Sequence, residues 1–133
     1  MNSFTEKLHA NKTYGHRYAI WTPVENLGGP NVGVLAVVEA KTALGKKTVS
    51  RYAVLELDFD GGRRFKLTKP GGAEVYFVNL PVDPTENEAC DCQGFSQHAH
   101  CKHIEGLTPF VRRGLLPRKE AKLLRDFMVD RGV

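Results

Sequence analysis

The chain has 133 residues, of which 41% are hydrophobic and 26% are charged, and its formal net charge is +4. This length suits one domain spanning residues 1–133, and the composition excludes a wholly disordered chain. No apolar segment approaches the roughly 20 residues that a membrane-spanning helix needs. The polar start MNSFTEKLHANK lacks the features of a secretory signal, so we expect an intracellular protein and not a secreted one.

The first third of the chain predicts one short helix and two strands. Ser3 and Glu6 form a capping-box pattern, which predicts a helix that ends at about Asn11. The aromatic-rich segment 14–22 predicts a strand. After the turn sequence NLGGPN, the almost continuous apolar run Val32–Ala40 predicts a second strand that is buried, followed by a loop over residues 41–47.

A hairpin is expected between residues 51 and 69, around the sequence DGG. A three-residue loop, Asp60–Gly62, would pair apolar residues with each other on the core face and opposite charges on the other face. A two-residue loop would mix the two kinds of partner, so the three-residue loop is preferred. The expected pairs are Leu57–Phe65 and Leu55–Leu67 on the core face, and Asp58–Arg64 and Glu56–Lys66 on the other.

A third strand is expected after the PGGA turn, over residues Glu74–Leu80. This strand would place Lys69 opposite Glu74, and Leu67 opposite Tyr76.

Two helices are expected at the C-terminal end. Residues 102–114 have a helical pattern, and a clearer amphipathic helix at about 117–131 has Pro117 at its first position and Gly132 after its end. With the strands, these helices predict an α+β fold, in which an antiparallel β-meander is followed by a cysteine-rich knuckle and C-terminal helices.

The three cysteines, Cys90, Cys92 and Cys101, are clustered in the sequence. An odd, clustered set without a secretory signal is typical of metal ligands rather than of disulfides. Cys90 and Cys92 would share one face of an extended segment. Because residues i and i+2 diverge on a helix, we expect Cys101 just before a helix and His103 in its first turn. The four residues predict one tetrahedral, structural Zn²⁺.

The fourth ligand has alternatives, since His98 and His100 lie beside the third cysteine. We expect these two histidines to be solvated or to lie around the ligands. Two other interpretations are disfavoured. Buried hydrophobic cysteines do not suit Cys92 and Cys101, which have polar neighbours, and the C-x-C spacing strains a disulfide.

The pattern C-x-C…C-x-H resembles a SWIM-type zinc finger over about residues 74–107. The resemblance implies that Cys90, Cys92, Cys101 and His103 are the zinc ligands. Members of that family occur in chromatin-associated, transposase-like and signalling proteins. The resemblance therefore implies a module that binds DNA or other proteins.

An enzyme is not expected, because three thiolates and an imidazole leave no open position on zinc for water or substrate. A hydrolase with Asp91 or Glu105 as its base is accordingly disfavoured. We also expect no membrane and no small-molecule substrate as partner.

The preferred partner is a nucleic acid, with DNA favoured over RNA, bound through basic residues near the C-terminus. These residues are Arg112, Arg113, Arg118, Lys119, Lys122 and Arg125. Arg64 and Lys66 offer little support, because the expected hairpin pairs them with carboxylates. The alternative is a protein–protein interaction adaptor that uses a sheet edge or the acidic loop Asp83–Asp91.

Overall fold

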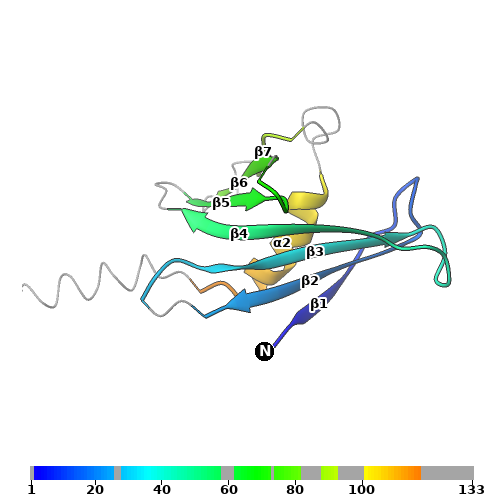
Figure 1. Ribbon diagram of the computed structural model, residues 1–133, viewed down its shortest axis with the longest axis horizontal. Helices are drawn as coiled ribbons and strands as arrows, with labels where there is room; N and C mark the ends of the chain where they lie inside the picture. The colour runs from blue at the N-terminus through cyan, green and yellow to red at the C-terminus, as the bar shows by residue number, and fades with distance from the viewer. Residues whose placement is uncertain are drawn as a thin grey trace, which may run out of the picture.

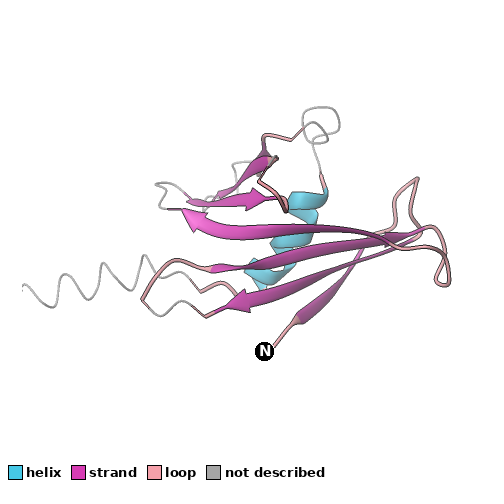
Figure 2. Ribbon diagram, in the orientation of Figure 1, coloured by secondary structure: helices cyan, strands magenta, loops and turns pink. Residues whose placement is uncertain are grey.

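The computed structural model describes residues 2–25, 28–57, 62–72, 74–81, 88–92 and 101–117. Within these ranges, seven strands form one antiparallel sheet in which each strand pairs with the next along the chain (Figure 1). The strands are β1 (Phe4–Leu8), β2 (His16–Val24), β3 (Val32–Ala40), β4 (Thr48–Leu57), β5 (Gly62–Thr68), β6 (Val75–Pro81) and β7 (Ala89–Cys90). The helix α2 (Lys102–Arg112) packs on one face of this sheet (Figure 2).

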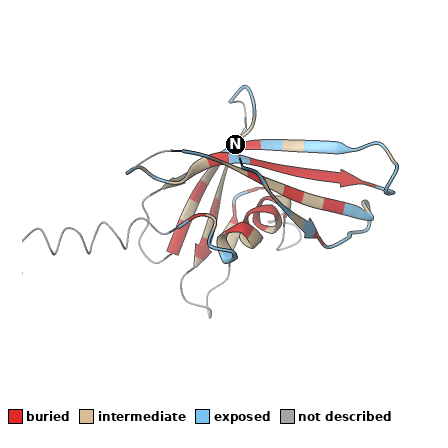
Figure 3. Cartoon of the chain, turned by 90° about the horizontal axis from the view of Figure 1, so that it is seen from below, coloured by how far each residue is buried: buried red, intermediate tan, exposed pale blue. Residues whose placement is uncertain are grey.

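The sheet curves around α2. The helix contacts β1, β2 and β3 towards one edge of the sheet and β6 and β7 at the other. Figure 3 shows the helix lying inside this curve, with its buried residues turned towards the strands. We call the sheet face towards α2 the inner face and the opposite one the outer face.

The core lies between the inner face and α2. Trp21, Tyr52 and Phe65 from the sheet are at most 1% exposed, and Leu107 and Phe110 from the helix are fully buried. The helix approaches β3 closely at Gly106, because a Cβ at this position would lie 3.0 Å from the Val37 side chain. Glycine at this position lets α2 lie deep in the sheet.

The expected α+β fold with C-terminal helices is wrong. Most described residues belong to the antiparallel sheet, and α2 is the one helix among them. The predicted helix at about 117–131 lies, except for Pro117, outside the described residues. The predicted strand Val32–Ala40 is confirmed with its bounds, and so are the loop at 41–47 and the helix that begins after Cys101.

The predicted helix from Ser3 to Asn11 is also wrong, since β1 occupies this segment and pairs Phe4 with Trp21. Phe4 and Leu8 face the core side while Thr5 and Lys7 are exposed, which is the alternation of a strand. The local capping pattern is outweighed by burial of these apolar side chains on the sheet.

The predicted hairpin register is wrong by one residue. The structure pairs Leu57 with Arg64, Glu56 with Phe65, Leu55 with Lys66 and Val54 with Leu67. A shift of one residue moves every side chain of β4 to the other face, so Tyr52, Val54 and Glu56 point inward.

An ion pair explains why a carboxylate occupies the inner face. Glu56 accepts hydrogen bonds from Arg63 at 2.8 and 2.7 Å and from Asn31 at 2.7 Å. Because its charge is compensated there, Tyr52 and Val54 can be the buried residues instead of Leu55 and Leu57.

The second predicted hairpin is confirmed. Leu67 pairs with Tyr76, and Lys69 donates its backbone N–H to the Glu74 carbonyl at 2.9 Å. The Lys69 and Glu74 side chains also form an ion pair of 3.1 Å.

No described helix is long and apolar enough to span a bilayer.

Candidate metal centre

The short strand β7 positions the first two cysteines at the edge of the sheet. Cys90 pairs with Val78 of β6, so its side chain points inward. Asp91 fixes the next turn of the chain, because its carboxylate accepts the Phe77 N–H at 2.8 Å and its own N–H donates to the Phe77 carbonyl at 3.3 Å. Cys92 follows two residues after Cys90 and is likewise buried.

The third cysteine stands at the start of α2. Cys101 is the N-cap residue and has an extended backbone, with φ −158° and ψ 164°. Its side chain makes no capping hydrogen bond, so the sulfur does not cap the N-terminus of the helix. His103 lies in the first turn, as predicted, and is 4% exposed.

The four side chains converge on one point. One ligand atom from each of Cys90, Cys92, Cys101 and His103 lies within 4.8 Å of all the others, and all four residues are buried. The Cys90 Sγ atom is 3.7 Å from His103 Nδ1. In a tetrahedral zinc site with bonds of about 2.3 and 2.0 Å, sulfur and nitrogen are about 3.5 Å apart. The cluster therefore has the donor set and the spacing to hold one metal ion.

Two tyrosines fix the orientation of the imidazole. The His103 ring stacks on Tyr76 with a centroid distance of 4.4 Å, and it meets the Tyr52 ring edge-on at 4.8 Å. Tyr76 is held in turn by a 2.7 Å hydrogen bond to Glu74, which together with burial raises the pKa of Tyr76 to about 12. Nδ1 faces the cysteines, while Nε2 is buried and has no hydrogen-bond partner among the described residues.

Hydrogen bonds between the thiols shift the pKa values of Cys90 and Cys101 in opposite directions. A hydrogen bond from Cys90 lowers the pKa of Cys101 to about 4, with burial opposing it and contacts from His103 and the Ile104 N–H assisting. The same hydrogen bond to Cys101, together with burial, raises the pKa of Cys90. No disulfide joins the three cysteines. These contacts favour the thiolate form of Cys101, which is the form that binds metals.

A second polar site fixes the other side of the first helical turn. Arg17 is 4% exposed and donates to Glu39 at 2.8 Å, to Glu105 at 3.0 Å and to the His9 carbonyl at 2.9 Å. Burial alone would lower the pKa of Arg17, but the hydrogen bonds to Glu105 and Glu39 raise it. Neither this network nor the contacts of Tyr52 and Tyr76 with His103 were expected from the sequence. Tyr52, Val54 and Glu56 alternate along β4. This alternation is the sequence signal that could have placed their side chains on the inner face.

The remaining predicted site residues have different positions. His98, His100, Arg118, Lys119, Lys122 and Arg125 lie outside the described residues. Arg112 is exposed, whereas Arg113 donates to Glu6 at 2.8 Å and lies over the Phe4 ring. Most of the acidic loop Asp83–Asp91 is also outside the described part. Asp91 and Glu105 are engaged with Phe77 and Arg17.

No protein-family model, no curated protein and no solved structure matches this chain. The resemblance to SWIM-type zinc fingers is therefore supported by the four-ligand pattern. The structure itself shows a buried cluster of four Cys and His residues that could hold a metal ion.

Proposed function

We propose that the protein is a zinc-stabilised binding module of the SWIM-like kind, in which Cys90, Cys92, Cys101 and His103 hold one structural zinc ion. The observation that carries this proposal is the convergence of ligand atoms from four buried residues, at the end of β7 and at the start of α2, within 4.8 Å of one another. Three thiolates and one imidazole favour zinc among the common divalent ions, because soft sulfur ligands in a tetrahedral arrangement suit it.

Bound zinc would supply a fixed cross-link between the edge of the sheet and the start of the helix. Contacts within the chain position the ligands for this cross-link. The hydrogen bonds of Asp91 hold the two first cysteines in place, and the ring of Tyr76 holds the imidazole at the angle where Nδ1 faces the sulfurs. With four protein ligands no coordination position is left for a substrate, so we propose a binding protein and not an enzyme.

Native mass spectrometry of the purified protein tests the proposal. We expect one zinc per chain, and we expect Cys92→Ser and His103→Ala to lose it. Asp91→Asn is the matched control, because the asparagine Oδ1 can still accept the Phe77 N–H and the variant should therefore retain the ion. Full zinc occupancy in Cys92→Ser, or a wild-type chain that takes up no zinc, would overturn the assignment.

We propose a nucleic acid as the partner of this module. The chain carries a net charge of +4, and phosphate contacts by lysine and arginine provide most of the affinity of sequence-independent binding. Among the predicted basic residues near the C-terminus, Arg112 is exposed while Arg113 is occupied by Glu6. Failure of the wild-type protein to shift DNA or RNA at about 50 mM salt would favour the protein-interaction alternative.

A further inference from the structure

The acidic side chains of the described strands are confined to one face of the sheet. The acidic side chains of the described strands, Glu6, Glu39 and Glu56, lie on the inner side. Each of them forms an ion pair with an arginine, at 2.7 or 2.8 Å. Arginines thus neutralise the acidic groups of the described strands on the inner face, the one towards α2.

The outer face of the same strands carries cations and no described acidic side chain. These cations are Lys7 on β1, Arg51 on β4, and Arg64 and Lys66 on β5. Within the described residues, Lys7, Arg51 and Lys66 form no ion pair. The observed register is the reason, because it turns Glu56 to the inner face and places Lys66 opposite Leu55.

Apolar surface and two aromatic rings lie among and beside these cations. Val34 and Val49 are 37% and 40% exposed on the outer face, and α2, the one described helix, covers the opposite side (Figure 1). The rings are Tyr18, paired across the strands with Lys7, and Phe77, paired with Lys66. The face therefore combines positive charge with flat apolar surface, which suits a polyanion that also has apolar rings.

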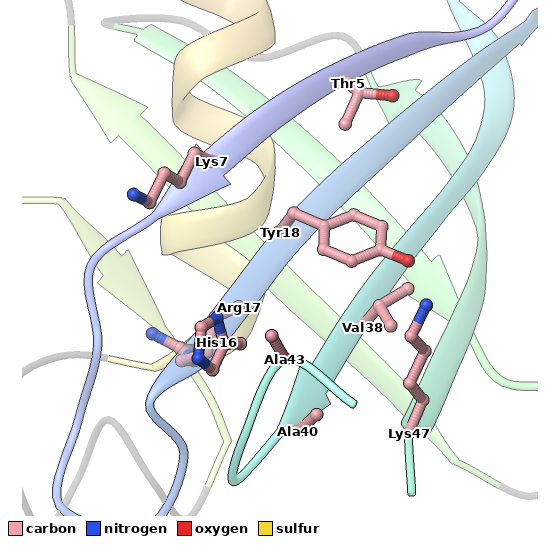
Figure 4. A pocket seen from close by; sticks show the side chains of 9 residues that line it. All are labelled: Thr5, Lys7, His16, Arg17, Tyr18, Val38, Ala40, Ala43 and Lys47. Carbon is pink, nitrogen blue, oxygen red and sulfur yellow. The ribbon is translucent and has the colours of Figure 1, made fainter. Parts of the chain in front are cut away.

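A hollow of about 350 Å³ opens at the end of this face, where β1, β2 and β3 meet the loop at 41–47. Figure 4 shows the Tyr18 ring lying across the strands beside Val38, with Lys47 reaching towards it. The Lys47 amino group is 5.9 Å from the centre of the ring. A nucleobase stacked on Tyr18 would displace the Lys47 amino group from above the ring, and Lys47 and Lys7 would then be near its phosphates.

We propose that the outer face of the sheet binds single-stranded nucleic acid, with Tyr18 stacking on a base and Lys7, Arg51 and Lys66 contacting phosphates. This inference rests on the proposed nucleic-acid partner and assigns its binding surface to the sheet instead of the C-terminal segment. Stacking on aromatic side chains requires unpaired bases. A duplex would instead call for an element that enters a groove, and on this face the described residues form strands and a short loop.

Fluorescence anisotropy with a labelled 20-nucleotide oligothymidylate and a duplex of the same length tests the proposal. Two triple variants are compared, Lys7→Glu/Arg51→Glu/Lys66→Glu on the outer face and Arg118→Glu/Lys122→Glu/Arg125→Glu in the C-terminal segment. Both reverse the same number of cations, so a difference in affinity reports the location of the site and not the net charge. Zinc content and the urea midpoint show that each variant is folded.

We expect the wild type to prefer the single strand, the outer-face variant to bind at least about tenfold more weakly at about 50 mM salt, and the C-terminal variant to bind like the wild type. Tyr18→Ala should weaken single-strand binding by about tenfold. Neutralising the three cations to glutamine should reduce the slope of log affinity against log salt by about 2.

Loss of binding in the C-terminal variant alone would overturn the assignment of the face and leave the nucleic-acid partner standing. Tighter binding of the duplex would overturn the single-strand preference. A wild type that binds neither oligonucleotide would reject the proposed partner itself, and the zinc measurement would still decide the metal centre separately.

Discussion

The first turn of α2 is attached to the sheet on two sides by two different kinds of polar site. On one side His103 faces the cysteines near β7, and on the other Glu105 accepts hydrogen bonds from Arg17 of β2. The Arg17 site is complete within the chain, since Glu39 and Glu105 compensate the buried guanidinium. The sulfurs of the cysteine site instead contact one another, the His103 imidazole and the Ile104 N–H. With the proposed zinc ion, the stability of the β6–β7 side would depend on the metal, whereas that of the β2–β3 side would not.

Removal of the metal should cause the largest loss of stability, and this loss should be confined to the β6–β7 side of α2. Structural zinc contributes on the order of 10 kcal/mol of apparent binding free energy, so chelation should unfold the cluster and the start of α2. Hydrogen exchange should rise over residues 88–92 and 101–112, while β2, β3 and β4 keep part of their protection. Equal loss of protection across the sheet would show that the two sides are not independent.

Arg17→Ala should destabilise the other side. The substitution leaves Glu39, which is 6% exposed, without its partner, and breaking a buried ion pair costs about 3–5 kcal/mol. Urea unfolding measures the loss. The variant should still bind one zinc, and the double change Arg17→Met/Glu39→Met should recover much of the stability because it removes both charges. A variant that loses zinc together with stability would contradict the separation of the two sites.

Tyr76→Leu should have an intermediate effect, confined to the cluster. Without the stacked ring the imidazole of His103 is less well oriented, and changes around metal ligands typically cost 10- to 100-fold in metal affinity. Competition with a chromogenic zinc chelator measures this affinity. Tyr14→Leu, outside the cluster, is the control and should leave zinc affinity unchanged. Equal zinc affinities of Tyr76→Leu and Tyr14→Leu would show that the Tyr76 ring does not orient the His103 imidazole for metal binding.

The ion pair between Arg113 and Glu6 should matter least. It has nearly the same length as the Arg17–Glu39 pair, 2.8 Å, but its side chains are 41% and 31% exposed. Exposed pairs contribute about 0.2–1 kcal/mol, so a double-mutant cycle should give a coupling within this range. A coupling as large as that of Arg17 and Glu39 would mean that burial is not what distinguishes the two pairs.

The metal cluster was predictable from the sequence because its geometry is local. Cys90 and Cys92 share a face by strand alternation, and the spacing of Cys101 and His103 requires a helix that begins between them. The buried strand at 32–40 was predictable for a similar reason, since a continuous apolar run of this length suits a central strand.

The errors arose where distant residues decide the local structure. Ser3 and Glu6 form a helix-start pattern, yet Phe4 packs across from Trp21, seventeen residues further on. The register of β4 and β5 depends on an inward Glu56 whose charge is compensated by Arg63 and Asn31, and this compensation appears only in the fold. The misplaced register also concealed the cations of the outer face, because it assigned carboxylate partners to Arg64 and Lys66.

The strictly sequential strand order has a consequence for folding. Every strand pairs with its neighbour in the chain, so the sheet can grow by local hairpin closures, which favours fast formation. The helix that covers the inner face comes after all seven strands. During synthesis, Trp21, Leu35 and Phe65 therefore lack this cover until residues 101–117 leave the ribosome, and Cys101 and His103, which complete the cluster, arrive in that same segment. Closure of the core and completion of the metal cluster thus wait for one segment of the chain, so in a zinc-poor cell the β6–β7 side of the core would be the part left open.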